Sequence, residues 1–146
     1  MIEIKPVTYP INAIVKIPGS KSYTNRALIT AALADGESTI ANALFSDDTK
    51  YMVSSLNTLG ITVKEEQNMN RFIVNGKGGV IPVKHANLFV GNAGTAMRFL
   101  TAMLTLGKGV YEIDGVARMR QRPIQDLLDG LNQLGADVVS KFNNGC

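Results

Sequence analysis

The chain is poor in the residues that form disulfides, metal sites and aromatic binding surfaces. Its 146 residues include one cysteine, Cys146, one histidine, His85, and no tryptophan. A single cysteine excludes an intrachain disulfide, and one cysteine with one histidine offers too few ligands for a Cys/His zinc site. We therefore expect a free thiol, an ordinary loop histidine and no bound metal.

Long apolar runs are also missing. No stretch approaches the roughly 18 apolar residues that a membrane-spanning helix needs. The opening Met-Ile-Glu-Ile-Lys lacks the basic and apolar regions of a secretory signal. These absences predict a soluble, cytoplasmic protein without membrane contact, and the chain length predicts one domain.

Positive charge is in slight excess and is concentrated in a few segments of the chain. The formal net charge is +3. The cations gather beside two glycine-rich segments and before the last predicted helix: Lys16, Lys21, Arg26, Arg98, Arg118, Arg120 and Arg122. Such a concentrated field suits a small anion. Nucleic acid is the alternative, but the four tyrosines and five phenylalanines do not interleave with these cations as a stacking surface requires, so we expect no nucleic acid.

Two segments share one layout. Residues 19–60 and 91–135 each contain a glycine-flanked loop, an arginine near the start of an apolar helix, a short strand and an amphipathic helix ending in Leu-Gly. The arginines are Arg26 and Arg98, and each Leu-Gly pair follows at nearly the same distance along the chain. Matching landmarks at a steady separation indicate a duplicated unit. Both copies place small residues and cations at a helix start, where anions bind.

The residue patterns predict an α/β fold. Strands are predicted at residues 2–5, 13–17, 38–44, 61–64 and 71–74. Good helix formers predict a helix over residues 24–34, which Asp35 and Gly36 end.

A second helix is predicted to begin after Ser46. Ser46 is a favoured N-cap, and Asp47 and Asp48 place negative charge in the first turn, where the helix dipole favours it. Gly60 is predicted to end this helix. Its buried face repeats at helical spacing through Met52, Leu56 and Leu59.

The helix predicted over residues 93–106 carries a single charge, Arg98. We expect this helix to be buried nearly all round, and an arginine there is costly unless an anion or a carboxylate pairs with it. Two partners remain open for Arg98: a salt bridge to Asp47 or Asp48, or a bound ligand.

The last helix is predicted to have Pro123 at its first position and Gly135 at its end. Its predicted buried face is made of Ile124, Leu127, Leu128, Leu131 and Leu134.

Three segments carry the chemistry of anion binding. In residues 18–26, a glycine admits close backbone approach, hydroxyl groups donate, and Lys21 and Arg26 add charge. The GxxxxGK[ST] order of a P-loop is absent, and a plain capped helix start would use the same residues. Residues 91–95 form a similar glycine-containing segment, here with two glycines. The third segment holds Arg118, Arg120 and Arg122, which form either a solvated cluster or an anion site.

Four ordered segments resemble one family. PGSKSYTNRAL, SDDT, GNAGTAMRFL and RMRQRPI are similar to the signature segments of 5-enolpyruvylshikimate-3-phosphate synthases, the shikimate-pathway enzymes that glyphosate inhibits. The family fold has two lobes, each of three βαβαββ units, with the active site between the lobes. The resemblance implies that residues 18–146 hold two of these units, about 19–85 and 86–146, and that residues 1–17 form strands of the other lobe.

The resemblance also implies an activity and the residues that serve it. The family transfers the enolpyruvyl group of phosphoenolpyruvate to the 5-hydroxyl of shikimate 3-phosphate, without a metal or organic cofactor, in the biosynthesis of chorismate and aromatic amino acids. Of the residues present, only Lys21 is a candidate catalytic residue. The shikimate 3-phosphate side would consist of Lys21, Ser22 and Arg26, and the phosphoenolpyruvate side of Lys21, Asn92, Gly94, Thr95 and Arg122.

Other residues are implied to support these contacts. Arg98 is expected to support the residues that touch the substrates and not to touch the substrates itself. Ser46, Asp47 and Asp48 are expected to cap a helix and to orient cations. Phe99 stands where many bacterial and plant members have proline. That departure is expected to affect helix packing and inhibitor sensitivity, and to leave the reaction unchanged.

The family continues beyond the length of this chain, through a third unit and the C-terminal lobe, which carries its catalytic carboxylate and lysine. We therefore expect an N-terminal portion of the enzyme, inactive alone, whose partner is the C-terminal remainder of a monomeric full-length protein.

Two alternatives belong to other classes. UDP-N-acetylglucosamine enolpyruvyl transferase shares the fold, but its members usually carry a reactive cysteine in the loop at residues 115–120, where this chain has none. A nucleic-acid-binding module is the non-enzymatic alternative, and its binding would depend steeply on salt concentration.

Overall fold

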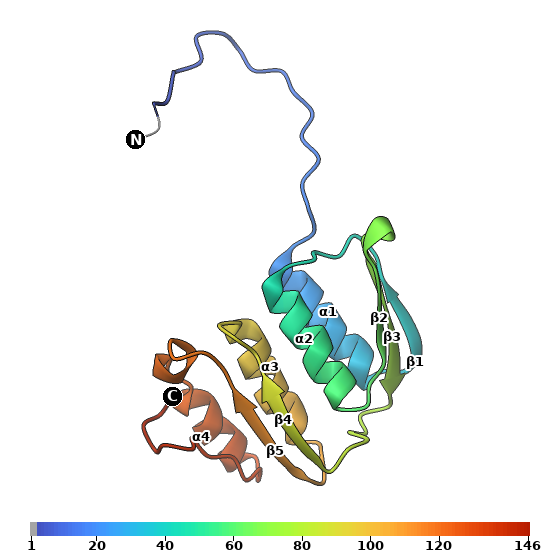
Figure 1. The fold of residues 1–146 in the computed structure, drawn as a ribbon, viewed down its shortest axis with the longest axis vertical. Helices are drawn as coiled ribbons and strands as arrows, with labels where there is room; N and C mark the ends of the chain where they lie inside the picture. Colours follow the sequence, from blue (N-terminus) through green and yellow to red (C-terminus); the bar gives the residue numbers. More distant parts are fainter. Residues whose placement is uncertain (1–2) are drawn as a thin grey trace.

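The computed structural model describes residues 3–146 of the chain, and this part folds into α-helices, two small sheets and two short 3₁₀ turns (Figure 1). The helices are α1 (Lys21–Leu33), α2 (Asp47–Thr58), α3 (Gly94–Leu104) and α4 (Gln125–Gln133). The strands are β1 (Asp35–Ile40), β2 (Val63–Glu66), β3 (Arg71–Lys77), β4 (His85–Phe89) and β5 (Val110–Asp114). The 3₁₀ turns are η1 (Gln67–Met69) and η2 (Met119–Gln121). The predicted α/β fold class is confirmed.

Helices α1, α2 and α3 lie between the two sheets, and α4 lies on the far side of β5 (Figure 1). One sheet is antiparallel with strand order β1-β3-β2, and the other pairs β4 with β5 in parallel. Helix α1 packs on β3, α2 and α3, while α2 also contacts β4. In Figure 1 the starts of α1, α2 and α3 all point toward the end of the molecule from which the N-terminal segment extends. This shared direction brings three helix starts to one end of the core.

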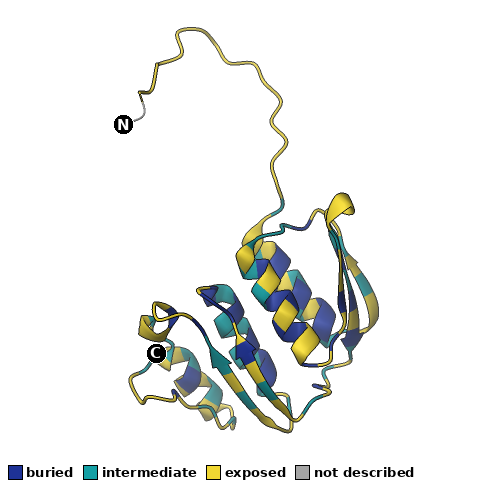
Figure 2. Ribbon diagram, viewed as in Figure 1, coloured by how far each residue is buried: buried dark blue, intermediate teal, exposed yellow. Residues whose placement is uncertain are grey.

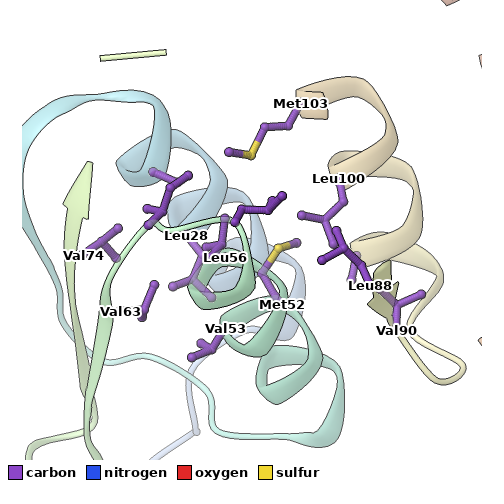
Figure 3. Packing of buried hydrophobic residues seen from close by; sticks show 14 of the residues in the cluster. Leu28, Met52, Val53, Leu56, Val63, Val74, Leu88, Val90, Leu100 and Met103 are labelled. Carbon is purple, nitrogen blue, oxygen red and sulfur yellow. The ribbon is translucent and has the colours of Figure 1, made fainter. Parts of the chain in front are cut away.

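The core is a single cluster of aliphatic side chains between these layers. Figure 3 shows Leu28 of α1, Met52 and Leu56 of α2 and Leu100 of α3 turned into one interior, and each is fully buried. Leu59 is also fully buried, which confirms the predicted Met52, Leu56 and Leu59 face of α2. Burial of each such side chain contributes about 1.5–3 kcal/mol. This packing fixes the relative positions of the three helix starts.

The start of α2 is capped as predicted. The Ser46 side chain accepts a hydrogen bond from the Thr49 backbone amide, and the Thr49 hydroxyl accepts one from the Ser46 amide. This reciprocal pair is a capping box, and Asp47 and Asp48 occupy the first turn. Gly60 follows the helix with a positive φ of 81°, as a C-cap glycine should.

The duplication predicted from the sequence has a structural counterpart near the ends of α2 and α4. The Asn57 side chain accepts from the Val63 amide at 2.9 Å and donates to the Val63 carbonyl at 3.5 Å. The Asn132 side chain makes the same pair of bonds with Val138, at 3.0 and 2.9 Å. The same amide bridge therefore ends both helices.

The two units differ after this bridge. In the first unit the chain continues into β2, which pairs with β3, and β3 pairs with β1. In the second unit residues 136–146 form no strand, and within residues 3–146 β5 pairs only with β4. The structure thus shows the helix-strand-helix part of the unit twice, and does not confirm two complete βαβαββ units.

The predicted N-terminal strands are not found. Residue 2 lies outside the described residues, and residues 3–5 and 13–17 form no strand. Their large side chains are exposed, with Ile14 completely so, and Figure 2 shows the whole segment projecting from the core. A strand needs a neighbour to pair its backbone groups and cover its apolar face. Within the part of the chain that the structure describes, neither lies beside residues 3–17. The strand predicted at residues 38–44 also shifts, because β1 starts at Asp35 and ends at Ile40.

The two last helices are less buried than predicted. In α3, Met97, Phe99 and four other residues are half-buried, so the helix is not buried all round. Leu128 in α4 is buried, but Leu134, the C-cap residue of that helix, is 85% exposed and is not covered by any other part of residues 3–146. Pro123 precedes the helix by two residues and does not occupy its first position. Among residues 3–146, no helix combines the length and apolarity needed to cross a membrane.

The close approach between β3 and α1 makes a test of this packing. A methyl group at Gly76 would lie 2.2 Å from the Ala34 carbonyl oxygen and 2.3 Å from that of Ala31. Both atoms are backbone and cannot move aside, so we expect Gly76→Ala to lower the free energy of unfolding by at least about 2 kcal/mol.

Gly130→Ala is the matched control, because a methyl group there meets nothing within 4 Å on helix α4. That substitution should be neutral or stabilising by up to about 1 kcal/mol. Urea unfolding followed by circular dichroism measures both. Equal effects of the two substitutions would contradict the packing described for β3.

Candidate functional site

The first glycine-rich segment is held rigidly at the start of α1. A methyl group at Gly19 would lie 2.2 Å from the Asn42 carbonyl oxygen, so only glycine allows this close approach. Ser20 caps the helix by accepting from the Tyr23 amide at 3.5 Å. The buried Thr24 hydroxyl donates to the Ser20 carbonyl at 2.8 Å and accepts from the Leu44 amide at 3.0 Å. These contacts fix the backbone that carries Lys21 and Ser22.

Lys21 is oriented by α2. Its ammonium lies 3.2 Å from the Asp48 carboxylate, with 48% of the lysine side chain and 26% of the aspartate side chain exposed. A pair this exposed adds about 1 kcal/mol at most to stability. Its effect is to direct the ammonium to the space in front of the α1 start. The prediction that Asp48 orients a cation is consistent with this contact.

Arg26 lies on an exposed part of α1 that faces α3. Its guanidinium carbon is 5.6 Å from the centre of the Phe99 ring. Across residues 3–146, its side chain makes no hydrogen bond or ion pair. Phe99 cannot be identified as the partner of Arg26 from the sequence, because the contact joins residues of different repeats.

The second glycine-rich segment begins α3 without a side-chain cap. Ala93 occupies the cap position, so no side chain bonds to the first amides of the helix. Gly91 has a φ of 55°, and a methyl group there would lie 2.4 Å from the Tyr51 ring. The loop is therefore packed tightly against α2, while the α3 start keeps backbone donors available.

Arg122 reaches this helix start from the segment between η2 and α4. Its backbone is extended, with φ −93° and ψ 124°, as expected before proline. Its Nη1 donates to the Asn92 carbonyl at 3.0 Å. A methyl group at Gly94 would lie only 2.3 Å from Nη2, so the guanidinium sits directly on the glycine. Asn92, Gly94 and Arg122 are therefore brought together, and Thr95 follows them in the first turn.

Of the two partners that the sequence left open for Arg98, the salt bridge is not formed. Asp48 pairs with Lys21, and Asp47 lies 3.7 Å from Lys50, so the salt-bridge alternative is wrong. Arg98 instead donates to the Gly94 carbonyl at 3.2 Å and to the Pro123 carbonyl at 2.6 Å. Two carbonyl acceptors offset the cost of half-burying the charge. The arginine thereby ties the α3 start to the segment that carries Arg122.

The three arginines of the RMRQR segment have different surroundings. Arg120 binds Asp114 with two hydrogen bonds, one of them 2.9 Å long from Nε. Arg118 contacts Gln121 at 3.3 Å. Arg122 alone of the three bonds to the α3 loop. The alternating arginines of the sequence predicted only a cluster of charge. The structure shows that Asp114, at the end of β5, neutralises Arg120.

Asp114 carries the clearest electrostatic effect near the site. Its hydrogen bonds from Arg120 lower the pKa of its carboxyl, partial burial opposes this, and the Gly115 amide lowers it further. The same pair raises the pKa of Arg120. Arg120 is therefore a fixed structural cation and is less available to a ligand than Arg122.

A cleft of about 780 Å³ lies between α3, β5 and α4 and touches Arg98, Arg120 and Arg122 at one side. Half of its lining residues come from β5 and residues 135–142. It lies beside the strand edge that has no partner among residues 3–146. The cleft therefore coincides with the unpaired edge of β5.

Comparisons with known proteins agree with the motifs. The family model of EPSP synthase (3-phosphoshikimate 1-carboxyvinyltransferase) matches residues 6–146. The chain is 50% identical over 144 residues to 3-phosphoshikimate 1-carboxyvinyltransferase of a Nostoc species. The aligned region covers 99% of this chain and 34% of that relative. The chloroplastic 3-phosphoshikimate 1-carboxyvinyltransferase of Petunia hybrida is 50% identical over 152 residues, covering 99% and 29%.

Solved structures give the same result. An EPSP synthase from Acinetobacter baumannii superposes with a TM-score of 0.80 at 25% identity, over 90% of this chain and 30% of that one. The chain thus spans about a third of the length of the curated relatives it matches. The names of the plant relatives include the word chloroplastic, so the cytoplasmic location stays a prediction, as do the roles of the site residues.

The Asp114–Arg120 pair predicts a pH effect. Because the pKa of Asp114 is lowered by folding, its contribution to stability is present above the unfolded-state pKa and is lost as the pH falls through the folded-state pKa. Arg120→Ala should raise the pKa of Asp114 toward its ordinary value, as measured by carboxyl NMR titration. Arg118→Ala should leave that pKa unchanged. An unchanged pKa in Arg120→Ala would show that Arg120 is not its cause.

Proposed function

The chain belongs to the EPSP synthase family, and from that premise we propose that it supplies anion-binding surface for the transfer of an enolpyruvyl group from phosphoenolpyruvate to shikimate 3-phosphate. One observation carries the proposal. Arg122 sits on Gly94 at the uncapped start of α3, and the neighbouring start of α1 carries Lys21, Ser22 and Arg26. Two groups of donors at adjacent helix starts suit two anionic substrates.

We assign phosphoenolpyruvate to the α3 start. Arg122 offers a planar fork for a phosphate or carboxylate, and the Gly94 and Thr95 amides add backbone donors. Glycine at position 94 keeps these amides and the guanidinium within reach of one ligand, because a larger residue would displace Arg122. Asn92 positions Arg122 through its backbone carbonyl.

We assign shikimate 3-phosphate to the α1 start. Ser22 offers a hydroxyl, and the N–H donors of the Arg26 side chain have no partner among the described residues 3–146. Lys21 stands between the two groups in this scheme and contacts both substrates. Its ammonium also offsets negative charge that develops during addition of the 5-hydroxyl and elimination of phosphate. These residues hold and orient the reactants, which lowers the entropic cost of bringing them together.

The proton transfers require groups that these residues do not provide. We propose that they come from the remainder of the enzyme, which would also cover the open edge of β5 and pair with residues 3–17. In the first repeat, β3 fills the corresponding edge of β1. The apolar side chains of residues 3–17 would then be buried in the other lobe. The two repeats would span about residues 19–85 and 86–146.

We expect the chain by itself to have no transferase activity, since it lacks those proton-transfer groups. The measurement is phosphate release from phosphoenolpyruvate in the presence of shikimate 3-phosphate. Release that depends on shikimate 3-phosphate and exceeds a blank without protein would contradict this part of the proposal.

Arg122 gives the main test of the site. A charge-assisted bidentate contact is worth roughly 1.5–3 kcal/mol, so Arg122→Ala should weaken phosphoenolpyruvate binding by about one to two orders of magnitude. The melting temperature should not change, because Arg122 lies outside the core. Arg122→Lys should recover little, because an ammonium lacks the planar fork.

Two further variants sharpen this test. Gly94→Ala should also weaken binding, because its methyl group displaces the guanidinium. Arg118→Ala is the matched control and should bind as the wild type does. Calorimetric titration with phosphoenolpyruvate measures all four variants. If Arg122→Ala melts several degrees lower and keeps its affinity, Arg122 is a structural residue and the site is wrongly assigned.

A further inference from the structure

Arg26 and Phe99 form a contact between the two repeats that the proposed function does not use. Arg26 lies in the second turn of α1, and Phe99 lies in the middle of α3. The guanidinium carbon is 5.6 Å from the centre of the ring, within the range of a cation–π interaction. No carboxylate among residues 3–146 lies within ion-pair distance of Arg26.

An aromatic partner differs chemically from a carboxylate. A carboxylate would use two of the N–H donors of the guanidinium and neutralise its charge. An aromatic ring attracts the cation through its π face and accepts none of the strong in-plane hydrogen bonds. Arg26 is therefore held in place while its donors and its charge remain available to an anion.

Phe99 itself is well anchored. It packs against the core while remaining half-buried. The residue before it, Arg98, bonds to the Gly94 and Pro123 carbonyls. Fully buried Leu100 follows it in the same helix. Because both sequence neighbours are fixed, the ring is a stationary support for a long and otherwise unrestrained side chain.

We propose that Phe99 is a positioning residue that orders the Arg26 guanidinium for an anionic ligand at the α1 start. The proposal depends on the proposed function for the assignment of Arg26 to shikimate 3-phosphate. It adds that α3, which carries the phosphoenolpyruvate side, also sets the geometry of the shikimate 3-phosphate side. An ordered side chain loses less conformational entropy on binding, and that difference appears as affinity.

The first experiment needs no ligand. Nitrogen-15 relaxation of the Arg26 Nε–H reports the mobility of the side chain. Phe99→Leu keeps an apolar side chain without a π face, so Arg26 should become mobile. Phe99→Tyr keeps the face, so Arg26 should stay ordered. Phe89→Leu is the control for loss of an aromatic ring, because the Phe89 ring contacts Tyr51. Equal Arg26 mobility in wild type and Phe99→Leu would overturn the proposal.

The second experiment measures affinity for shikimate 3-phosphate by titration of the chain. Phe99→Leu should bind about two- to five-fold more weakly, the size expected of an exposed cation–π contact, and Phe99→Tyr should bind as the wild type does. In an Arg26→Ala background, Phe99→Leu should have no further effect. Melting curves identify any variant whose fold is disturbed. If Phe99→Leu is disturbed, the affinity of Phe99→Tyr is compared with that of the wild type instead.

The outcomes separate the two hypotheses. If Arg26→Ala binds as tightly as the wild type, the proposed function of Arg26 fails. If Arg26→Ala loses affinity but Phe99→Leu does not, only the positioning role fails. If Phe99→Leu loses as much affinity in the Arg26→Ala background as in the wild type, Phe99 acts on the fold or on another residue, and the proposal is likewise overturned.

Discussion

The packing of α1 against α2 and α3 is the constraint on which the rest of this structure depends. Leu28, Met52, Leu56 and Leu100 are all fully buried in that interface, and cores of this density do not deform gradually. The interface therefore fixes where each helix begins. Because the three helices run in one direction (Figure 1), their starts share one end of the core. Donors from segments far apart in sequence reach the same side of the molecule as a result.

The cations at that end are distinguished by their partners. Arg120 is paired with Asp114, and Arg98 is bonded to two carbonyls. Arg122 donates to a single backbone carbonyl and Arg26 contacts an aromatic ring, so each guanidinium keeps N–H donors that no group within residues 3–146 uses. This division between structural and available cations supports the proposed anion sites more strongly than the number of positive charges does.

The unpaired edges of the structure follow from the same repeat. The amide bridges of Asn57 and Asn132 are equivalent, but only the first leads into a strand pair. The exposed Leu134, the cleft beside β5 and the projecting residues 3–17 all lie where a further strand or layer is absent from residues 3–146. The predicted strands of the N-terminal segment and the predicted burial of Leu134 fail at these places, because strands and amphipathic faces are stabilised by neighbours.

The sequence by itself determined the elements whose signals are local. Ser46 and Gly60 mark the ends of α2, the spacing of Met52, Leu56 and Leu59 marks its buried face, and the motif order identified the family. Periodicity, capping and motif order act within a few residues, so they can be read without the fold. Tertiary structure alone decided that Arg98 binds carbonyls and not Asp47 or Asp48, that Arg122 and not Arg120 meets Gly94, and that Phe99 contacts Arg26. Those choices depend on which side chains meet across helices and strands, and that is set by packing between distant segments.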